Sequence, residues 1–92
     1  MSRQLRVGVV GVGHMGSYHV AALSELLDYE IVAVCDLDEK RAKYIADKYG
    51  TVFFKRPEDM LDSVDAVTIA VPTRHHFSVS RFFLQSGVHV LV

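Results

Sequence analysis

Four short runs of the chain are almost continuously apolar and rich in valine and isoleucine, and they constrain the fold more than any other feature. They span residues 5–10 (LRVGVV), 30–35 (EIVAVC), 65–71 (DAVTIAV) and 88–92 (VHVLV). Continuous rather than alternating hydrophobicity is typical of strands that are covered on both faces, as in a parallel sheet. A shorter run at 51–54 is a candidate for a further strand.

Helical patterns fill the intervals between these runs. The first, over residues 14–27, places Met15, Tyr18, Ala22 and Leu26 on one apolar stripe. The other helices are expected at positions marked by capping or terminating residues. They are 38–49, with Asp38 as cap and Gly50 at the end, a short helix opened by Pro57, and a last helix near 74–86 that ends at Gly87.

Strands and helices therefore alternate from the first run to the last. This order predicts an α/β fold with a doubly wound parallel sheet of five strands and right-handed crossovers. A doubly wound nucleotide-binding domain commonly has six strands. We therefore expect residues 1–92 to be an incomplete domain from a longer protein.

The segment VGVVGVGHMGSYH connects the first predicted strand to the first predicted helix. Its Gly11, Gly13 and Gly16 form the pattern G-x-G-x-x-G, which is weak alone but typical of dinucleotide binding between a strand and a helix. The first glycine permits a tight turn, and the second lets the backbone approach a pyrophosphate. The third lets the helix pack closely on the strand.

Two further features favour a dinucleotide site. The amides near His14 and Met15, at the start of the helix, are placed to donate to phosphate oxygens. Asp36 stands twenty positions after Gly16, at the end of the second predicted strand. A carboxylate there accepts the hydroxyls of an adenosine ribose and would repel a 2′-phosphate, so NAD is favoured over NADP.

These residues also have structural interpretations. The glycines could serve only turns and packing, and Asp36 could be a cap or turn residue. Lys40 and Arg41 could reach a 2′-phosphate, although their spacing is typical of a solvated helix face. The single cysteine, Cys35, is expected to be a small buried hydrophobic residue rather than a nucleophile.

The segment AVPTRHH, residues 70–76, stands at the end of the run 65–71, the fourth predicted strand. The strand order reverses there, and ligands bind beyond the carboxyl ends of the strands. Pro72 ends the strand, and Thr73 supplies a hydroxyl at the mouth of this crevice. His76 is a possible catalytic residue, because a histidine there could face a nicotinamide or a substrate hydroxyl. The alternatives are that His76 packs in the core and that His75 is exposed to solvent.

Charge and composition exclude several classes of function. The formal net charge of −1 gives no basic face for nucleic acid or an anionic membrane. No stretch approaches the roughly 18 apolar residues of a membrane span. One cysteine permits no internal disulfide, and the histidines show no metal-ligand spacing. We therefore expect a cytoplasmic protein without a metal site.

The motifs VGVVGVGHMGSYH, VAVCDLDEKRA, DAVTIAVPTRHH and SGVHVLV resemble, in this order, the amino-terminal domain of the Gfo/Idh/MocA oxidoreductases. The resemblance covers essentially the whole chain and implies a Rossmann domain that binds a nicotinamide cofactor. The family often has asparagine where this chain has Thr73. Carried over by position, the resemblance implies a pyrophosphate cradle of Gly11, Gly13, His14 and Met15, a ribose contact at Asp36, and a nicotinamide side lined by Val71, Pro72, Thr73 and His76.

The resemblance also implies what lies beyond this sequence. In the family the fifth strand continues into Glu-Lys-Pro, whose lysine helps orient the substrate, and a second domain carries the substrate pocket. The sequence given stops at Val92. We expect a homo-oligomeric dehydrogenase acting on a sugar, cyclitol or nucleotide sugar as the full-length protein, with residues 1–92 inactive alone. The alternative is a stand-alone NAD-sensing or interaction module without catalysis.

Overall fold

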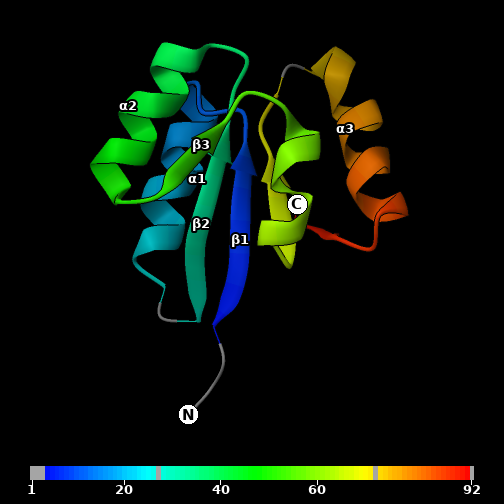
Figure 1. Ribbon diagram of the computed structural model, residues 1–92, viewed down its shortest axis with the longest axis horizontal. Coiled ribbons are helices and arrows are strands. Elements are labelled where there is room, and N and C mark those ends of the chain that lie inside the picture. The colour runs from blue at the N-terminus through cyan, green and yellow to red at the C-terminus, as the bar shows by residue number, and fades with distance from the viewer. Residues whose placement is uncertain (1–3, 27, 72, 92) are drawn as a thin grey trace.

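Five parallel strands form a single sheet at the centre of the molecule (Figure 1). The computed structural model describes residues 4–26, 28–71 and 73–91, and for Thr73 the backbone only. The strand order is β3-β2-β1-β4-β5, which confirms the doubly wound arrangement and the additional short strand. The strands are β1 (Leu5–Val10), β2 (Tyr29–Cys35), β3 (Val52–Phe54), β4 (Ala66–Ile69) and β5 (His89–Leu91).

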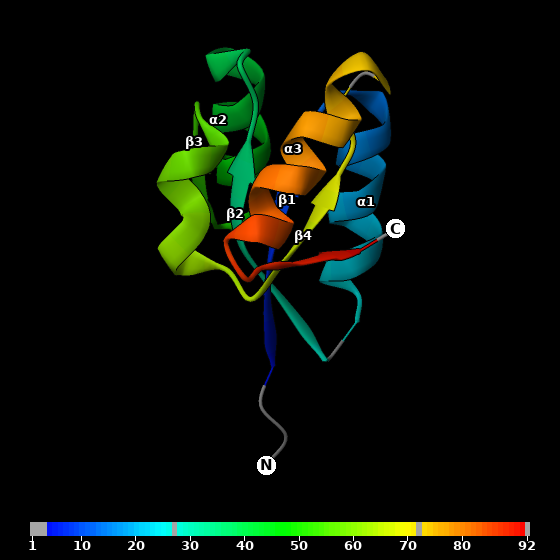
Figure 2. The ribbon, with the colours of Figure 1, turned by 90° about the vertical axis from the view of Figure 1, so that its right-hand side faces the viewer.

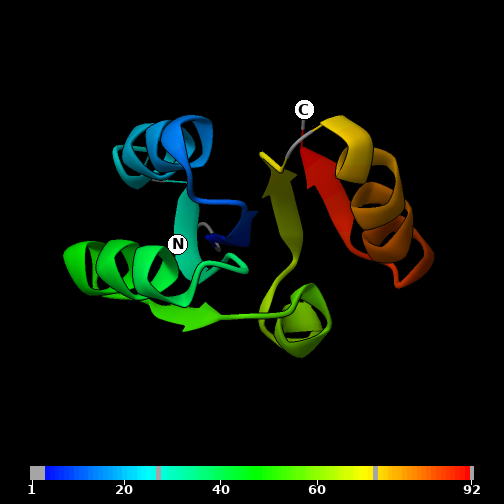
Figure 3. The same ribbon diagram turned by 90° about the horizontal axis from the view of Figure 1, so that it is seen from above.

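Helices cover both faces of this sheet (Figure 3). On one face lie α1 (His14–Ser24) and α2 (Glu39–Tyr49), and on the other η1 (Pro57–Ser63) and α3 (Thr73–Gln85). The short helix opened by Pro57 is a 3₁₀ helix rather than an α-helix. The strand β5 lies at the edge of the sheet, beside β4 (Figure 2).

The two faces bury separate apolar clusters, as the continuous hydrophobicity of the strands predicts. The cluster under α1 and α2 consists of Val9, Val12, Val20, Val34, Ala42, Ile45 and Ala46. The cluster under η1 and α3 consists of Val10, Ala33, Cys35, Met60, Val64, Val67, Ile69, Phe83 and Val88. Neighbouring residues of β1 belong to opposite clusters, so the strand is covered on both sides.

The apolar stripe predicted for the first helix does not face the sheet. Met15 and Tyr18 are 60% and 70% exposed, and Leu26 lies beyond the end of α1 with 49% exposed. The helix packs instead through Gly16 and Val20, which are buried. A glycine brings the helix closer to the sheet than large side chains would, and this explains why the larger residues point outward.

The ends of α2 are as predicted. The Asp38 side chain accepts a hydrogen bond from the Arg41 backbone amide at 3.2 Å, as a cap does. Gly50 ends the helix in the left-handed conformation, with φ of 67°.

The strand β4 is shorter than the predicted range of 65–71. Asp65 lies just before β4 and is not part of the strand. It connects the start of β4 to β1 through hydrogen bonds. The Asp65 carboxylate accepts hydrogen bonds from the Arg6 backbone amide at 3.0 Å and from its side chain at 3.0 and 3.2 Å. The Asp65 amide donates to the Arg6 carbonyl at 2.8 Å. This paired contact fixes the register at the amino ends of the two central strands.

Candidate functional site

Three predicted segments of the site meet at the carboxyl edge of the sheet. The strands β2, β1 and β4 are neighbours, so the residues that follow them emerge side by side. The Gly11 amide donates to the Cys35 carbonyl at 2.7 Å, and the Ala70 amide donates to the Val10 carbonyl at 2.8 Å. The glycine turn therefore sits between the residues that follow β2 and those that follow β4.

Gly11 makes the tight turn that its position predicts. Its φ is 90°, a conformation that other residues rarely adopt. A Cβ atom at this position would also stand 2.8 Å from the carbonyl carbon and oxygen of Ala70. The structural interpretation therefore accounts fully for this glycine.

Gly16 allows α1 to pack on the turn. A Cβ atom here would overlap the carbonyl oxygen of Gly11. The neighbouring Ser17 also holds the start of α1 against the glycine turn. Its amide donates to the Gly13 carbonyl at 2.8 Å, and its hydroxyl donates to the Val12 carbonyl at 2.8 Å. Packing within the domain therefore accounts for Gly16 as well.

Gly13 differs from the other two glycines. Its φ of −68° is available to any residue. A Cβ atom here would meet only the end of a flexible side chain, with the Nη1 atom of Arg41 at 3.3 Å. Neither turn geometry nor packing among the described residues requires a glycine at this position. The absence of a side chain leaves the backbone open to an approaching ligand.

The start of α1 carries no side-chain cap among the described residues, whereas α2 has Asp38 as cap and Glu39 in its first turn. His14 and Met15, the first two residues of α1, are both exposed. The first amides of a helix have no intrahelical partner and attract anions. This end of α1 is therefore available to a negatively charged group.

The Asp36 carboxylate accepts hydrogen bonds from two segments, the glycine turn and the start of α2. Its Oδ2 accepts from the Val12 amide at 2.9 Å, and its Oδ1 accepts from the Asp38 amide at 2.8 Å. The second contact makes Asp36 a turn residue, which was one of the two interpretations of the sequence. A carboxylate has about four acceptor sites, so each oxygen retains capacity for one further donor.

Arg41 lies beside the site, although its helical spacing favoured a solvated helix face over contact with a 2′-phosphate. Its Nη1 lies 4.0 Å from Asp36 Oδ2, and its Nη2 lies 3.9 Å from Asp38 Oδ2. Helical spacing placed this residue on the solvated face, and its side chain is indeed half exposed. The signal for the other interpretation is its position in the first turn of α2, three residues after the cap.

The segment after β4 is described in part. Val71 is partly buried against the core cluster under η1 and α3. Pro72 and the side chain of Thr73 lie outside the described residues. His75 and His76 are both exposed, so the alternative of a packed His76 is wrong and that of an exposed His75 is confirmed.

Both histidines have polar neighbours on α3. The Nδ1 of His76 lies 3.4 Å from the Ser80 hydroxyl, and the Nε2 of His75 accepts from Arg74 Nε at 3.2 Å. His76 therefore stands at the start of α3 with its ring accessible to solvent.

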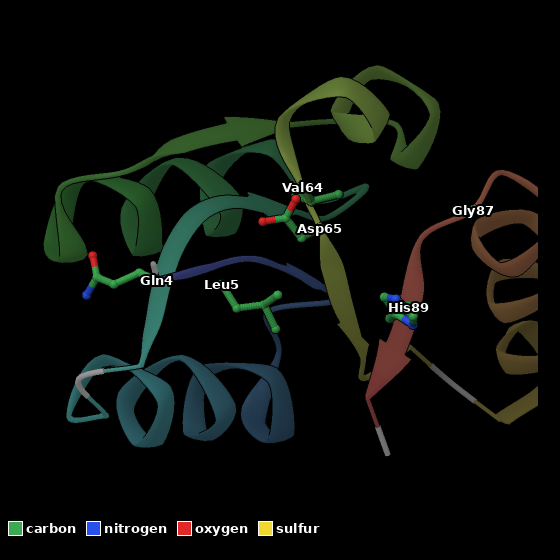
Figure 4. Close-up of a pocket in the computed structure, with 6 residues that line it drawn as sticks. All are labelled: Gln4, Leu5, Val64, Asp65, Gly87 and His89. Atoms are coloured by element: carbon green, nitrogen blue, oxygen red, sulfur yellow. The ribbon is translucent and has the colours of Figure 1, made fainter. Parts of the chain in front are cut away.

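An open hollow of about 420 Å³ lies at the opposite edge of the sheet (Figure 4). It sits where β1, β4 and β5 begin, whereas ligands of doubly wound sheets bind where the strands end. The hollow is therefore separate from the candidate site. Its lining residues are Gln4, Leu5, Val64, Asp65, Gly87 and His89.

Residues 4–26, 28–71 and 73–91 contain neither a candidate metal centre nor a membrane-spanning helix. No three His, Cys, Asp or Glu side chains in these ranges gather in a way that could hold a metal ion. No helix in the same ranges is long and apolar enough to cross a membrane.

Cys35 lies directly beneath the site but is 2% exposed. Burial raises the pKa of its thiol to about 12, and the charges of Asp36, Glu58 and Asp59 add to this effect. A rise from 9.0 to about 12 lowers the thiolate fraction at pH 8 about a thousandfold. The structure therefore supports the prediction of a structural cysteine.

Cys35 is accordingly expected to resist alkylation in the folded protein. Labelling by iodoacetamide at pH 8, followed by mass spectrometry of the peptide that contains Cys35, should show at least about a hundredfold slower reaction than in denaturant. Rapid labelling without denaturant would contradict the burial of this thiol.

The sequence model of a family described as "Oxidoreductase family, NAD-binding Rossmann fold" matches residues 5–92. The chain is 38% identical over 91 residues to the UDP-N-acetylglucosamine 3-dehydrogenase of Acidithiobacillus ferrooxidans, covering 96% of this chain and 28% of that protein. It is 41% identical over 95 residues to an inositol 2-dehydrogenase of Corynebacterium glutamicum, covering 99% and 28% respectively.

The chain is also similar to a solved structure of a protein with bound NAD. GenD2 from gentamicin A biosynthesis, solved in complex with NAD, superposes with a TM-score of 0.95 at 30% identity. The match covers 100% of this chain and 27% of that chain. The chain therefore spans less than a third of the length of the proteins it resembles.

Proposed function

Because the chain belongs to the Gfo/Idh/MocA family of oxidoreductases and forms an NAD-binding Rossmann domain, we propose that its carboxyl edge holds the cofactor as follows. The pyrophosphate lies on the glycine turn and the open start of α1, cradled by Gly11, Gly13, His14 and Met15. The adenosine ribose lies against Asp36. Helix amides and the helix dipole favour a phosphate at such a position.

Gly13 carries this proposal. Gly11 and Gly16 are explained by the turn and by packing, whereas Gly13 has neither reason among the described residues. A ligand that needs close contact with the backbone supplies the missing reason, and the pyrophosphate of a dinucleotide has that requirement. The uncapped start of α1 beside Gly13 supports an anionic ligand.

Asp36 is the basis for proposing NAD rather than NADP. Its two oxygens accept one amide each, so both retain an acceptor site for the two hydroxyls of the adenosine ribose. A 2′-phosphate would replace one hydroxyl donor by an anion and repel the carboxylate. The existing hydrogen bonds hold the carboxylate in place before the ligand arrives.

The whole protein is proposed to be a dehydrogenase acting on a sugar, cyclitol or nucleotide sugar, because the relatives named above are dehydrogenases of this kind. NAD, when bound, supplies the hydride acceptor. Residues 1–92 would form the amino-terminal cofactor domain, with the substrate pocket in a second domain. Named dehydrogenases among the relatives favour an enzyme over a stand-alone NAD-sensing module.

The nicotinamide side is proposed to be lined by Val71, Pro72, Thr73 and His76. The exposed ring of His76 at the start of α3 is consistent with contact to the cofactor or the substrate. Its role as a proton carrier stays a prediction, as do the cytoplasmic location and the homo-oligomer.

The test of the ribose contact is the Asp36→Ser variant. We expect the unchanged full-length protein to bind NAD at least about tenfold more tightly than NADP, a difference of roughly 1.4 kcal/mol. Hydrogen bonds to a charged group contribute roughly 1.5–3 kcal/mol each. Asp36→Ser should therefore weaken NAD binding at least about tenfold and narrow or reverse the preference, as measured by calorimetric titration of both cofactors.

Asp38→Ser is the matched control. It removes a nearby carboxylate of α2 but leaves Asp36 and its bond to Val12 in place. We expect it to change stability more than cofactor selectivity. An unchanged protein that prefers NADP, or an Asp36→Ser variant with unaltered NAD affinity, would refute the ribose contact.

A further inference from the structure

A buried polar side chain interrupts the apolar strand β4. Val67 and Ile69 belong to the cluster under η1 and α3, and side chains alternate along a strand, so Thr68 points to the face that α1 covers. Thr68 is 7% exposed and is the one polar residue among the buried ones that the structure describes. Its hydroxyl lies 3.3 Å from the Nδ1 atom of His19, a partly buried residue of α1. The pair therefore connects α1 to β4.

Packing alone does not require a hydroxyl at position 68. Valine has nearly the shape of threonine, and Thr68 lies in register with Val9 on one side and with Leu91 on the other. Apolar groups of the same shape can replace a buried hydrogen-bonded pair at little cost in stability. A satisfied buried hydrogen bond does, however, fix one relative position of the elements that it joins. The reason for the pair therefore lies in what these two elements position.

The pair lies a short way behind the candidate site on both elements. His19 is five residues after the first residue of α1, or about 7.5 Å along the helix axis. Thr68 is two residues before Ala70, or about 7 Å along the strand. The start of α1 is the proposed pyrophosphate cradle, and β4 leads into residues 71–76 on the proposed nicotinamide side. A contact between His19 and Thr68 thus sets how far apart these two parts of the site lie.

A dinucleotide has to contact both parts at once. Its pyrophosphate and its nicotinamide are covalently joined, so one group helps the other to bind only where the two parts of the site lie at a matching distance. Holding them at that distance before the ligand arrives also lowers the cost of binding.

We propose that His19 and Thr68 are positioning residues for the cofactor. Their hydrogen bond holds the start of α1 at the distance from the segment after β4 that lets the pyrophosphate and the nicotinamide of one NAD molecule bind together. The two residues act through the segments that they hold and not through contact with the cofactor. This inference rests on the proposed function, since it requires NAD to lie along the carboxyl edge of the sheet.

A comparison of NAD with ADP separates this role from a general contribution to stability. ADP carries the adenosine and the pyrophosphate but no nicotinamide, so it uses only one of the two parts of the site. In the full-length protein, Thr68→Val removes the hydroxyl and keeps the shape, and His19→Leu removes the ring nitrogen. Calorimetric titration should show that each variant weakens NAD binding about fivefold and ADP binding less than about twofold.

Three further variants test whether the hydrogen bond is responsible. The double variant with Thr68→Val and His19→Leu should bind NAD no more weakly than either single variant, because both changes remove the same contact. Thr68→Ser keeps the hydroxyl and should stay within about twofold of the unchanged protein. Ser24→Ala is the matched control on α1, because the Ser24 hydroxyl donates to the Ala21 carbonyl of the same helix at 2.7 Å. It should change both affinities less than about twofold.

Three results would overturn the positioning role alone. They are an equal loss of NAD and ADP affinity, unchanged affinities in a variant without the hydrogen bond, and additive losses in the double variant. Failure of the unchanged protein to bind NAD would overturn the proposed function as well. Thermal unfolding followed by circular dichroism checks that the variants fold. Since either single variant removes the bond, one folded variant is enough for the comparison of NAD with ADP.

Discussion

Gly16→Ala is expected to lower the free energy of unfolding by about 2–4 kcal/mol, although alanine is the better helix former. The added Cβ would overlap the Gly11 carbonyl oxygen, which is backbone and cannot move aside by changing rotamer. Helix propensity returns at most about 1 kcal/mol. The steric cost therefore outweighs the gain in helix propensity, so the substitution destabilises the protein. The helix α1 would have to shift away from the glycine turn.

Urea denaturation of the two proteins measures this difference, with Gly50→Ala as the control. Gly50 has a φ of 67° but no atom within 4 Å of an added Cβ, so it isolates the cost of left-handed backbone. That cost is about 1–2 kcal/mol. A Gly16→Ala effect no larger than that of Gly50→Ala would contradict the close contact between α1 and the turn.

Gly13→Ala is expected to have the opposite profile, with stability nearly unchanged and NAD binding weakened at least about tenfold. The φ of −68° suits alanine, and Arg41 is flexible enough to move away from the added methyl group. The same methyl group would stand where the pyrophosphate has to approach the backbone. Denaturation and calorimetric titration on the same sample separate the two effects.

The neighbouring Arg41 requires one more control. If Gly13→Ala acted by displacing that side chain, the substitution would not weaken NAD binding in an Arg41→Ala background. We expect an equal loss of NAD affinity in both backgrounds. NAD affinity that is unchanged by Gly13→Ala would remove the observation on which the pyrophosphate site depends.

Most of the sheet could be predicted from the sequence because its strands are covered on both sides. A strand with apolar residues on both faces produces a continuous run, and such a run is visible without knowledge of its partners. The bounds shifted where a polar residue stands just before the strand, as Asp65 does at the start of β4. The strand β3 is the hardest to predict, because the short run 51–54 carries little pattern.

The orientation of α1 could not be predicted for a related reason. The helix is apolar around most of its circumference, so Met15 and Tyr18 were as plausible facing the sheet as Val20. The close approach at Gly16 decides which side faces inward. That contact depends on where the Gly11 carbonyl lies, which no helical periodicity encodes.

Asp36 and Arg41 show the same limit within the site. The position of Asp36 after a strand makes it a candidate, because the end of a parallel strand is a predictable place for a ligand. Arg41 reaches the site through the direction of a long side chain. That direction depends on tertiary geometry, so the sequence alone does not decide between the solvated face of α2 and a contact with a ligand.

If Asp36 holds the adenosine ribose as proposed, its double attachment limits how the cofactor preference of such a domain can evolve. The same carboxylate supports the Val12 amide in the glycine turn and the Asp38 amide at the start of α2. A substitution of the Asp36 carboxylate that admits a 2′-phosphate also removes the acceptor from at least one of these amides. Serine or asparagine can still accept from one of them, whereas alanine cannot. A change of cofactor preference is therefore easier through a small polar residue at position 36 than through an apolar one.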